Sequence, residues 1–375
     1  MNLNNDKVYF PGLNLLRFIA AATVVIYHTE NIKRYYPASY HLVDYPFIEN
    51  CGQMAVNFFF VLSGFLITYL LLREKNTHNT VFIKHFYMRR ILRIWPIYYI
   101  VFFTTCIFLF STDSLFKSLS STSIALNIVI LPNIADLFGQ DMMLRHLWSI
   151  GVEEQFYIIW PLLIKFFKPT LKVSVIFISI FVILNILVWG LIKVNIYDKE
   201  TLISIYRLLS NIRMHCLVLG SIGACLFYYN HKSLTFIYHP VTQALTYIVT
   251  ALILFSNFRF PAINNEIYCS LFLIIILNIS SNPKSFFKLE YSWTGFLGKI
   301  SYGMYMYHFF AVKISIFFFT ITLGNHLNSI SFILLAQFSA LSLTILFASS
   351  SYYFIEKKIL NYKSNFSKVE SISAK

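Results

Sequence analysis

Two ionisable residues lie in one apolar segment near the start of the chain, "LLRFIAAATVVIYHT", residues 15–29. Arg17 and His28 are eleven positions apart, which at about 100° per residue is three helical turns plus roughly 20°. A helix would carry both on one face, about 16 Å apart along its axis. Ionisable residues inside apolar segments are costly and by default suggest function. The alternative, two helix-end residues whose polar tips reach the membrane surface, is equally compatible with the spacing.

A second segment, "FYMRRILRIWPIYY" (residues 86–99), places arginines at the start of an apolar run. Arg90 and Arg93 are three residues apart and share a helical face, whereas Arg89 points elsewhere. Guanidinium groups bind phosphate bidentately, so the face of Arg90 and Arg93 suits a phosphorylated ligand. The alternative is a plain positive anchor at a cytoplasmic helix end, and that interpretation is favoured for Arg89.

A third segment, "RHLWSIGVEEQFYIIWP" (residues 145–161), gathers His146, Glu153 and Glu154 at the head of another apolar run. Adjacent residues lie about 100° apart around a helix, so only one of the glutamates is expected to face the interior. The helix dipole also stabilises acidic residues at an N-terminus, which explains one glutamate without any chemistry. That alternative does not explain why the histidine and the glutamates gather at the depth predicted for His28.

Two more polar residues lie inside apolar runs. Ser63 precedes Gly64 in mid-run, where small residues let helices approach closely. No G-x-S-x-G elbow surrounds Ser63, so packing is favoured over a nucleophile. His308 lies in "KISYGMYMYHFF" (residues 299–310), where a core histidine and a site residue are equally compatible with its position. The five cysteines form no CxxC pair and no Cys/His metal spacing, so neither a zinc site nor a disulfide framework is expected.

These residues must be positioned by helices in a membrane. The 375-residue chain is 57% hydrophobic and 12% charged, whereas a soluble domain is about 25% charged. Crossing a bilayer takes about 20 helical residues, and the predicted spans are 13–29, 54–72, 94–111, 152–168, 173–193, 213–230, 240–257, 266–282, 300–323 and 330–355. The shorter run within 123–139 is predicted as a half-helix or interfacial segment. The predicted fold class is all-α, a polytopic membrane bundle of about ten transmembrane helices.

Basic residues set the predicted orientation of this bundle. The segment "REKNTHNTVFIKHFYMRR" between the second and third spans is strongly basic, and cytoplasmic loops of membrane proteins collect Lys and Arg. The bias places both termini in the cytoplasm. It also accounts for the net charge of +14, so no nucleic-acid partner is expected.

Five motifs, in order, resemble acyltransferase family 3, a family of integral membrane acyltransferases. They are an Arg and a His separated by ten residues (Arg17 to His28), "FFFVLSGFL" from Phe58, "RILRIWP" from Arg90, "WSIGVEEQFY" from Trp148 and "SYGMYMYH" from Ser301. One small departure is Ile150, where the family pattern has Leu. The resemblance implies a membrane acyltransferase domain at 1–362 and a short polar cytoplasmic tail at 363–375. Some relatives carry a fused extracytoplasmic esterase-like domain, and this chain is expected to be the stand-alone form.

The resemblance implies transfer of an acyl group, usually acetyl, from a coenzyme A thioester. The expected acceptor is a hydroxyl of an extracytoplasmic glycan, free or lipid-linked, such as O-antigen, capsule or peptidoglycan. Some relatives instead modify small molecules such as macrolides. The expected location is the bacterial cytoplasmic membrane, where lipids surround the protein. Neither a metal nor a permanently bound cofactor is expected, because a thioester is already activated and acetyl-CoA is a substrate.

The residues and the resemblance together suggest a mechanism. Arg90 and Arg93 would bind the donor phosphates, and Arg17 would hold the donor at the cytoplasmic end of its helix. His28 would act as general base on the acceptor hydroxyl or briefly take the acyl group. Glu153 or Glu154 would hold the imidazole in the needed tautomer. The remaining expected substrate- or donor-binding residues are Ser63, His146, Trp148, Tyr302 and His308.

A protein of another class fits the same pattern of spans and charges. A transporter or flippase of a lipid-linked sugar also has about ten spans and buried ionisable residues. Loss of glycan acetylation on changing His28, with glycan still exported, would distinguish the enzyme from the transporter.

Overall fold

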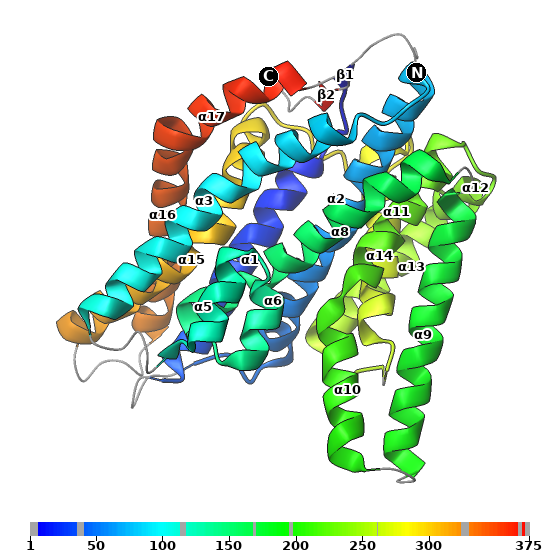
Figure 1. Cartoon of the computed structure of the whole chain (residues 1–375). Helices are drawn as coiled ribbons and strands as arrows, with labels where there is room; N and C mark the ends of the chain where they lie inside the picture. Colours follow the sequence, from blue (N-terminus) through cyan, green and yellow to red (C-terminus); the bar gives the residue numbers. More distant parts are fainter. Residues whose placement is uncertain are drawn as a thin grey trace.

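The computed structural model describes residues 7–35, 41–112, 118–167, 170–194, 198–260, 262–323, 330–366 and 370–371. These residues form a bundle of helices, as Figure 1 shows. Within the described ranges, the β structure is one parallel pair of two-residue strands, β1 (Lys7–Val8) and β2 (Glu370–Ser371). The predicted all-α fold class is confirmed.

The long helices are α1 (Leu13–Lys33), α2 (Pro46–His78), α3 (Ile83–Ser111), α8 (Trp148–Phe166), α9 (Thr170–Val194), α11 (Met214–Tyr228), α13 (Pro240–Phe255), α14 (Asn264–Ser281), α15 (Thr294–Leu323) and α16 (Ile330–Ser351). The shorter ones are α5 (Ser121–Ile128), α6 (Pro132–Ala135), η1 (Asp136–Phe138), α7 (Met142–Arg145), α10 (Lys199–Ile212), α12 (Ser233–Ile237), the π-helical η3 (Tyr352–Glu356), α17 (Lys357–Asn361) and η4 (Tyr362–Phe366). Each predicted span overlaps one of the long helices.

Several of these helices suit a bilayer. Five are long and apolar enough to cross it, namely α2, α3, α9, α15 and α16, the last continuing through η3 and α17. The helices α11 and α13 are apolar but shorter. This supports a multi-pass membrane protein, while the count of ten spans and the side on which each terminus lies stay predictions.

The segment 123–139 contains no helix of spanning length. It is divided among α5, α6 and η1, which have 8, 4 and 3 residues. Pro132 opens α6 in the first helical turn, where its missing N–H costs nothing. The prediction of a short, non-spanning segment agrees with this division.

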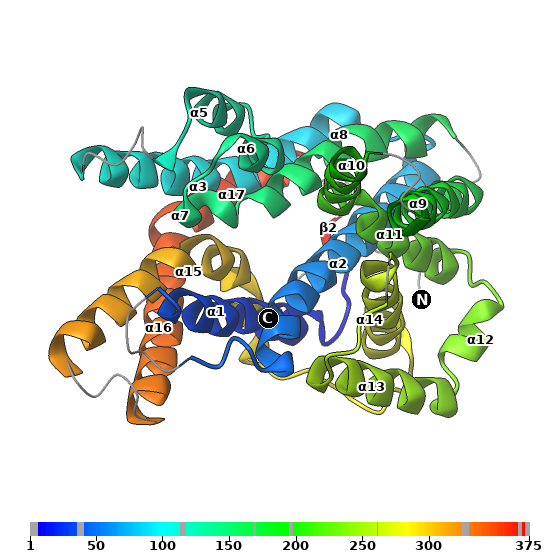
Figure 2. The same ribbon diagram turned by 90° about the horizontal axis from the view of Figure 1, so that it is seen from below.

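Helices α1, α2, α11 and α15 form the centre of the bundle. Seen along the helices, α1 lies between α15 and α2, and α2 packs against α11 on its other side (Figure 2). A side chain on Gly64 would overlap the backbone of Leu217, and one on Gly220 would overlap the backbone of Val61. The predicted close helix approach at Gly64 is therefore confirmed.

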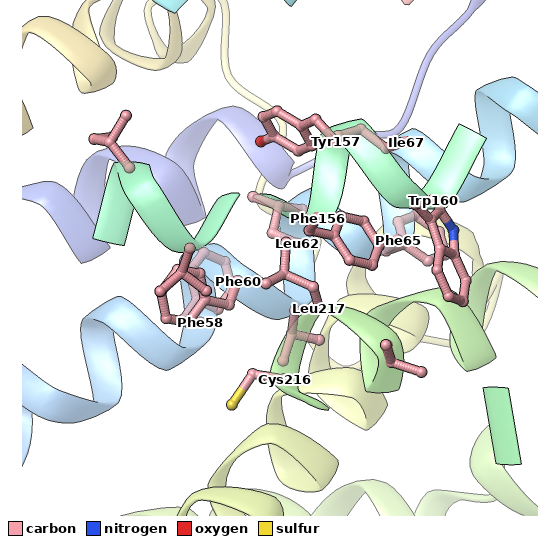
Figure 3. Packing of buried hydrophobic residues seen from close by; sticks show 14 of the residues in the cluster. Phe58, Phe60, Leu62, Phe65, Ile67, Phe156, Tyr157, Trp160, Cys216 and Leu217 are labelled. Atoms are coloured by element: carbon pink, nitrogen blue, oxygen red, sulfur yellow. The ribbon is translucent and has the colours of Figure 1, made fainter. Parts of the chain in front are cut away.

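Large apolar side chains fill the contact around these glycines. Figure 3 shows Phe60 and Leu62 of α2 meeting Phe156 of α8 and Leu217 of α11 in one buried cluster. Burying such side chains is worth about 1.5–3 kcal/mol each in water. Within lipid, close van der Waals packing takes over much of this role.

The helical hairpin of α9 and α10 extends away from the rest of the bundle (Figure 1). The predicted spans at 173–193 and 213–230 leave the residues between them unassigned, and α10 forms there. Asp198 explains its start, because its carboxylate accepts hydrogen bonds from the N–H groups of Glu200 and Thr201.

The start of α3 anchors the end of the chain. Arg89 forms an ion pair with Glu74 of α2 at 3.1 Å and donates a hydrogen bond of 2.6 Å to the carbonyl of Phe366. Arg89 thus points away from Arg90 and Arg93, as predicted. The polar tail is predicted from residue 363, but η4 already packs on α3 at 362–366.

Candidate active site

A cavity of about 190 Å³, partly open to solvent, lies where α1, α2, α3, α8 and α15 meet. The apolar part of its lining comes mainly from α2. Its polar lining residues are Arg17, Ser63, Arg90, Arg93, Ser149, Glu153, Tyr157, Ser301, Tyr302 and Tyr305. The cavity therefore brings together predicted site residues from five separate helices.

The charge of this cavity is mainly positive. Arg17 enters from α1, and Arg90 and Arg93 enter from one face of α3, as their spacing predicts. The Arg90 guanidinium lies 5.6 Å from the ring centroid of Tyr157, and its Nε is buried with no hydrogen-bond partner among the described residues. Glu153 is the one acid among the described lining residues. Such a site favours an anionic ligand with oxygen acceptors.

Glu153 and Glu154 diverge, as adjacent helical residues must. Glu153 faces the cavity, where Tyr157 Oη donates to its Oε2 at 2.8 Å and lies 2.6 Å from Ser63 Oγ. Glu154 instead accepts a hydrogen bond of 3.1 Å from the indole N–H of Trp95. One glutamate therefore serves the cavity, in agreement with the prediction.

The predicted hydrogen bond from His28 to a glutamate is absent among the described residues. Glu153 accepts from Tyr157, Glu154 accepts from Trp95, and the Nδ1 of His28 has no partner. Glu153 is five residues after the start of α8, which is about 7.5 Å along the helix axis at about 1.5 Å per residue. Its carboxylate therefore lies beside the arginines in the cavity lining.

Three histidines gather beside the cavity. The rings of His28 (α1) and His146 (between α7 and α8) each lie 4.9 Å from the ring of His308 (α15), measured between centroids. Phe309 packs against all three rings, at 4.6 Å from His28 and 5.0 Å from His146. His146 and His308 are almost completely buried. The structure thus places His146 and His308 with His28, in what we call the histidine cluster.

Tyr305 joins the cavity to the histidine cluster. Its hydroxyl donates to the His146 carbonyl at 2.8 Å and lies 2.7 Å from Ser149 Oγ. Its ring lies 5.7 Å from that of His308. Tyr305 was not predicted as a site residue from the sequence. Its position three residues before His308, on the same helical face, was the signal that could have indicated a place in the site.

Of the remaining residues near the site, Tyr302 is in the cavity lining, whereas Trp148 and Glu356 are not. Tyr302 lines the cavity and donates a hydrogen bond of 2.9 Å to the carbonyl of Ile94. Trp148 is not among the lining residues; its ring lies 4.9 Å from the guanidinium of Arg213. Glu356 was not predicted as a site residue from the sequence. It is the last residue of the π-helical η3, is buried and accepts a hydrogen bond from Ser351. Its signal in the sequence was a lone acid at the end of the uncharged run "SSSYYFIE".

The fold and this site define a class: a polytopic membrane protein with a basic cavity that adjoins a cluster of histidines. The family model described as an acyltransferase domain, that of acyltransferase family 3, matches residues 10–349. The chain belongs to this family.

Named relatives match along most of the chain. The peptidoglycan O-acetyltransferase OatA of Listeria monocytogenes is 26% identical over 381 residues, which cover 94% of this chain and 56% of that protein. A Staphylococcus aureus protein, provisionally named an O-acetyltransferase, is 28% identical, with 96% of this chain and 59% of that protein covered. The chain thus spans little more than half the length of these relatives. No solved structure matches it significantly.

Proposed function

We propose that the chain is a membrane O-acyltransferase that moves an acetyl group from acetyl-CoA to a hydroxyl of an extracytoplasmic glycan. The observation that carries the proposal is the basic cavity whose wall residue, Tyr305, also contacts the histidine cluster. The names of the relatives support acetyl transfer and favour a peptidoglycan acceptor over O-antigen or capsule. The proposed location is the bacterial cytoplasmic membrane, with both termini in the cytoplasm.

In this proposal the donor docks from the cytoplasm with its phosphates at Arg90 and Arg93. The cavity is smaller than the roughly 300–1,000 Å³ of a typical ligand pocket, so it holds only part of the coenzyme. Arg17 lines the same cavity, and it is eleven residues from His28 along α1. The thioester would therefore lie between the arginines and the histidine cluster.

The acyl transfer itself would use His28. Its imidazole takes the proton of the acceptor hydroxyl while that oxygen bonds to the thioester carbon. The carbon–sulfur bond then breaks, and coenzyme A leaves as a thiolate that takes the proton from His28. A route in which His28 first carries the acetyl group would use the same ring.

The test replaces His28 with Ala in cells that depend on this chain for glycan acetylation. A general base contributes roughly 10²–10⁴-fold, so we expect glycan-bound acetate, measured by mass spectrometry, to fall at least 10²-fold. The matched control is His231→Ala, which changes an exposed histidine in the turn after α11. Immunoblots of the membrane fraction check that both variants insert normally.

Two outcomes would contradict the proposal. Unchanged acetylation in the His28→Ala variant would rule out this mechanism. Loss of surface glycan, with the remaining glycan still acetylated, would indicate the transporter instead.

A further inference from the structure

The ring of His308 is fixed by one hydrogen bond. Its Nδ1 lies 2.6 Å from the backbone carbonyl oxygen of Tyr305. A carbonyl oxygen can only accept, so Nδ1 must carry the proton. In the neutral imidazole the other nitrogen, Nε2, then holds a lone pair. This Nε2 is buried and has no partner among the residues described.

His28 also has a ring nitrogen without a hydrogen-bond partner among the described residues. Its Nδ1 is also buried without a partner among the described residues, and its ring centroid lies 4.9 Å from that of His308. The two rings are tilted by 36°. At this separation, ring nitrogens turned toward each other come within hydrogen-bond distance. Buried polar atoms without partners are rare and require an explanation.

His146 is the other histidine near this lone pair, and both of its ring nitrogens are also buried without a partner among the described residues. Its ring is nearly perpendicular to that of His308, at 76°, and stacks on Phe309 at 26°. Of the two histidine rings beside His308, that of His28 makes the smaller angle with it.

We propose that His308 is a positioning residue for His28. The lone pair on Nε2 of His308 accepts a hydrogen bond from Nδ1–H of His28 and so holds the proton of His28 on Nδ1. The Nε2 of His28 is then the free base for the acceptor hydroxyl. His308 takes the part that a carboxylate takes in a hydrolytic triad, and the carbonyl of Tyr305 fixes the chain of hydrogen bonds.

The proton balance of the transfer is unchanged. The hydroxyl proton moves to Nε2 of His28, whose positive charge the neutral His308 stabilises by its hydrogen bond. The proton then passes to the departing thiolate, and His308 gains and loses none. This inference rests on the proposed function, because it assigns His28 the base of that reaction.

The first test reads the tautomers directly. The full chain, labelled with ¹⁵N-histidine and placed in lipid nanodiscs, is examined by solid-state NMR. The signals are assigned from the His28→Ala and His308→Gln variants. We expect His308 and His28 each to carry the proton on Nδ1, and His28 to lose this preference in His308→Ala. A proton on Nε2 of His308, or an unchanged His28 tautomer in His308→Ala, would overturn the inference whatever the activity.

The second test separates positioning from donor binding. Inverted membrane vesicles that contain the native acceptor receive radiolabelled acetyl-CoA, and the initial rate of label entering glycan is measured. We expect His308→Ala to lower this rate by about 10–100-fold, less than the roughly 10²–10⁴-fold loss of a general base itself. Acetyl-CoA affinity should stay within about twofold, because neither histidine lines the cavity. His308→Gln, whose amide oxygen can accept a hydrogen bond near the position of Nε2, should recover part of the rate.

The control for replacing a buried histidine is His215→Gln. His215 is as buried as His308 but lies on α11, stacked on Phe181 at 4.1 Å, and should keep the wild-type rate. A wild-type rate in His308→Ala, or no advantage of Gln over Ala, would overturn the inference and leave the proposed function standing. Absence of labelled glycan in the wild type would overturn the proposed function itself.

Discussion

At the scale of residues, like charges share a confined space. Arg17, Arg90 and Arg93 face one cavity, and Glu153 is the one acid among its described lining residues. Acidic groups lie near two of these arginines, Glu153 and Glu154 near Arg90 and Glu356 near Arg93. In the cavity lining itself the guanidinium groups outnumber the acids, which favours an anionic ligand. The buried, unpartnered Nε of Arg90 supports this explanation.

Replacing Arg90 and Arg93 together with Ala should therefore weaken acetyl-CoA binding. A hydrogen bond to a charged group is worth about 1.5–3 kcal/mol, so we expect a loss on the order of 10–100-fold, measured on purified protein by calorimetry. Arg145→Ala, which changes an exposed arginine in an ion pair with Asp136, serves as the control. Affinity equal to that of the control would show that the donor-site assignment is wrong.

Tyr305 lies between the cavity, which it lines, and the histidine cluster, which it contacts through His146 and His308. Tyr305→Phe removes its contacts with the His146 carbonyl and Ser149. Since a buried hydrogen bond contributes about 0.5–1.5 kcal/mol, we expect a lower thermal midpoint in detergent and slower acetyl transfer. Ser149→Ala removes one of these contacts and should have the smaller effect. Equal effects, or none in Tyr305→Phe, would contradict this account of Tyr305.

At the scale of elements, the contact of α2 with α11 depends on the absence of side chains. Gly64 and Gly220 each lie against the backbone of the opposite helix, and Ser63, the residue before Gly64, lies in the cavity lining. The same contact lets Phe60 and Leu217 interlock beside it (Figure 3).

Gly64→Ala should therefore destabilise the bundle, although alanine is the better helix former. Overpacking costs about 1–3 kcal/mol, which should appear as a lower thermal midpoint of the purified protein. Gly190→Ala in α9 is the matched control, because a side chain there meets open space, and it should be neutral or slightly stabilising. Equal midpoints for the two variants would contradict the close approach of α2 and α11.

At the scale of the whole molecule, the arginine-lined cavity and the histidine cluster lie toward opposite ends of α1, with Arg17 in the first and His28 in the second. The predicted orientation directs the arginines toward the cytoplasm, where the donor is made, and the histidines toward the outer acceptor. The proposed reaction requires this orientation.

Cysteine labelling tests the orientation. In a cysteine-free background, the two exposed positions to label are 232, which lies between α11 and α12, and 257, which lies between α13 and α14. A maleimide that does not cross membranes should label Asn257→Cys on intact cells and leave Lys232→Cys unlabelled until the cells are opened. The reverse pattern would contradict cytoplasmic termini.

The sequence by itself determined the features that a single helix decides. Apolar runs gave the helices, and helical periodicity gave the shared face of Arg90 and Arg93 and the divergence of Glu153 from Glu154. The packing role of Gly64 was also readable, because only a small residue allows two helices to touch. These features depend on residues close in sequence, whose relative positions the helix fixes.

Only the tertiary structure decided which clusters meet. The sequence predicts a glutamate beside His28, but the packing of α1, α8 and α15 places Glu153 with the arginines and His308 with His28. Tyr305 and Glu356 gain their places in the same way. Spacing within one helix gives depth and direction, whereas contacts between distant residues depend on how far and at what angle each helix lies against the next.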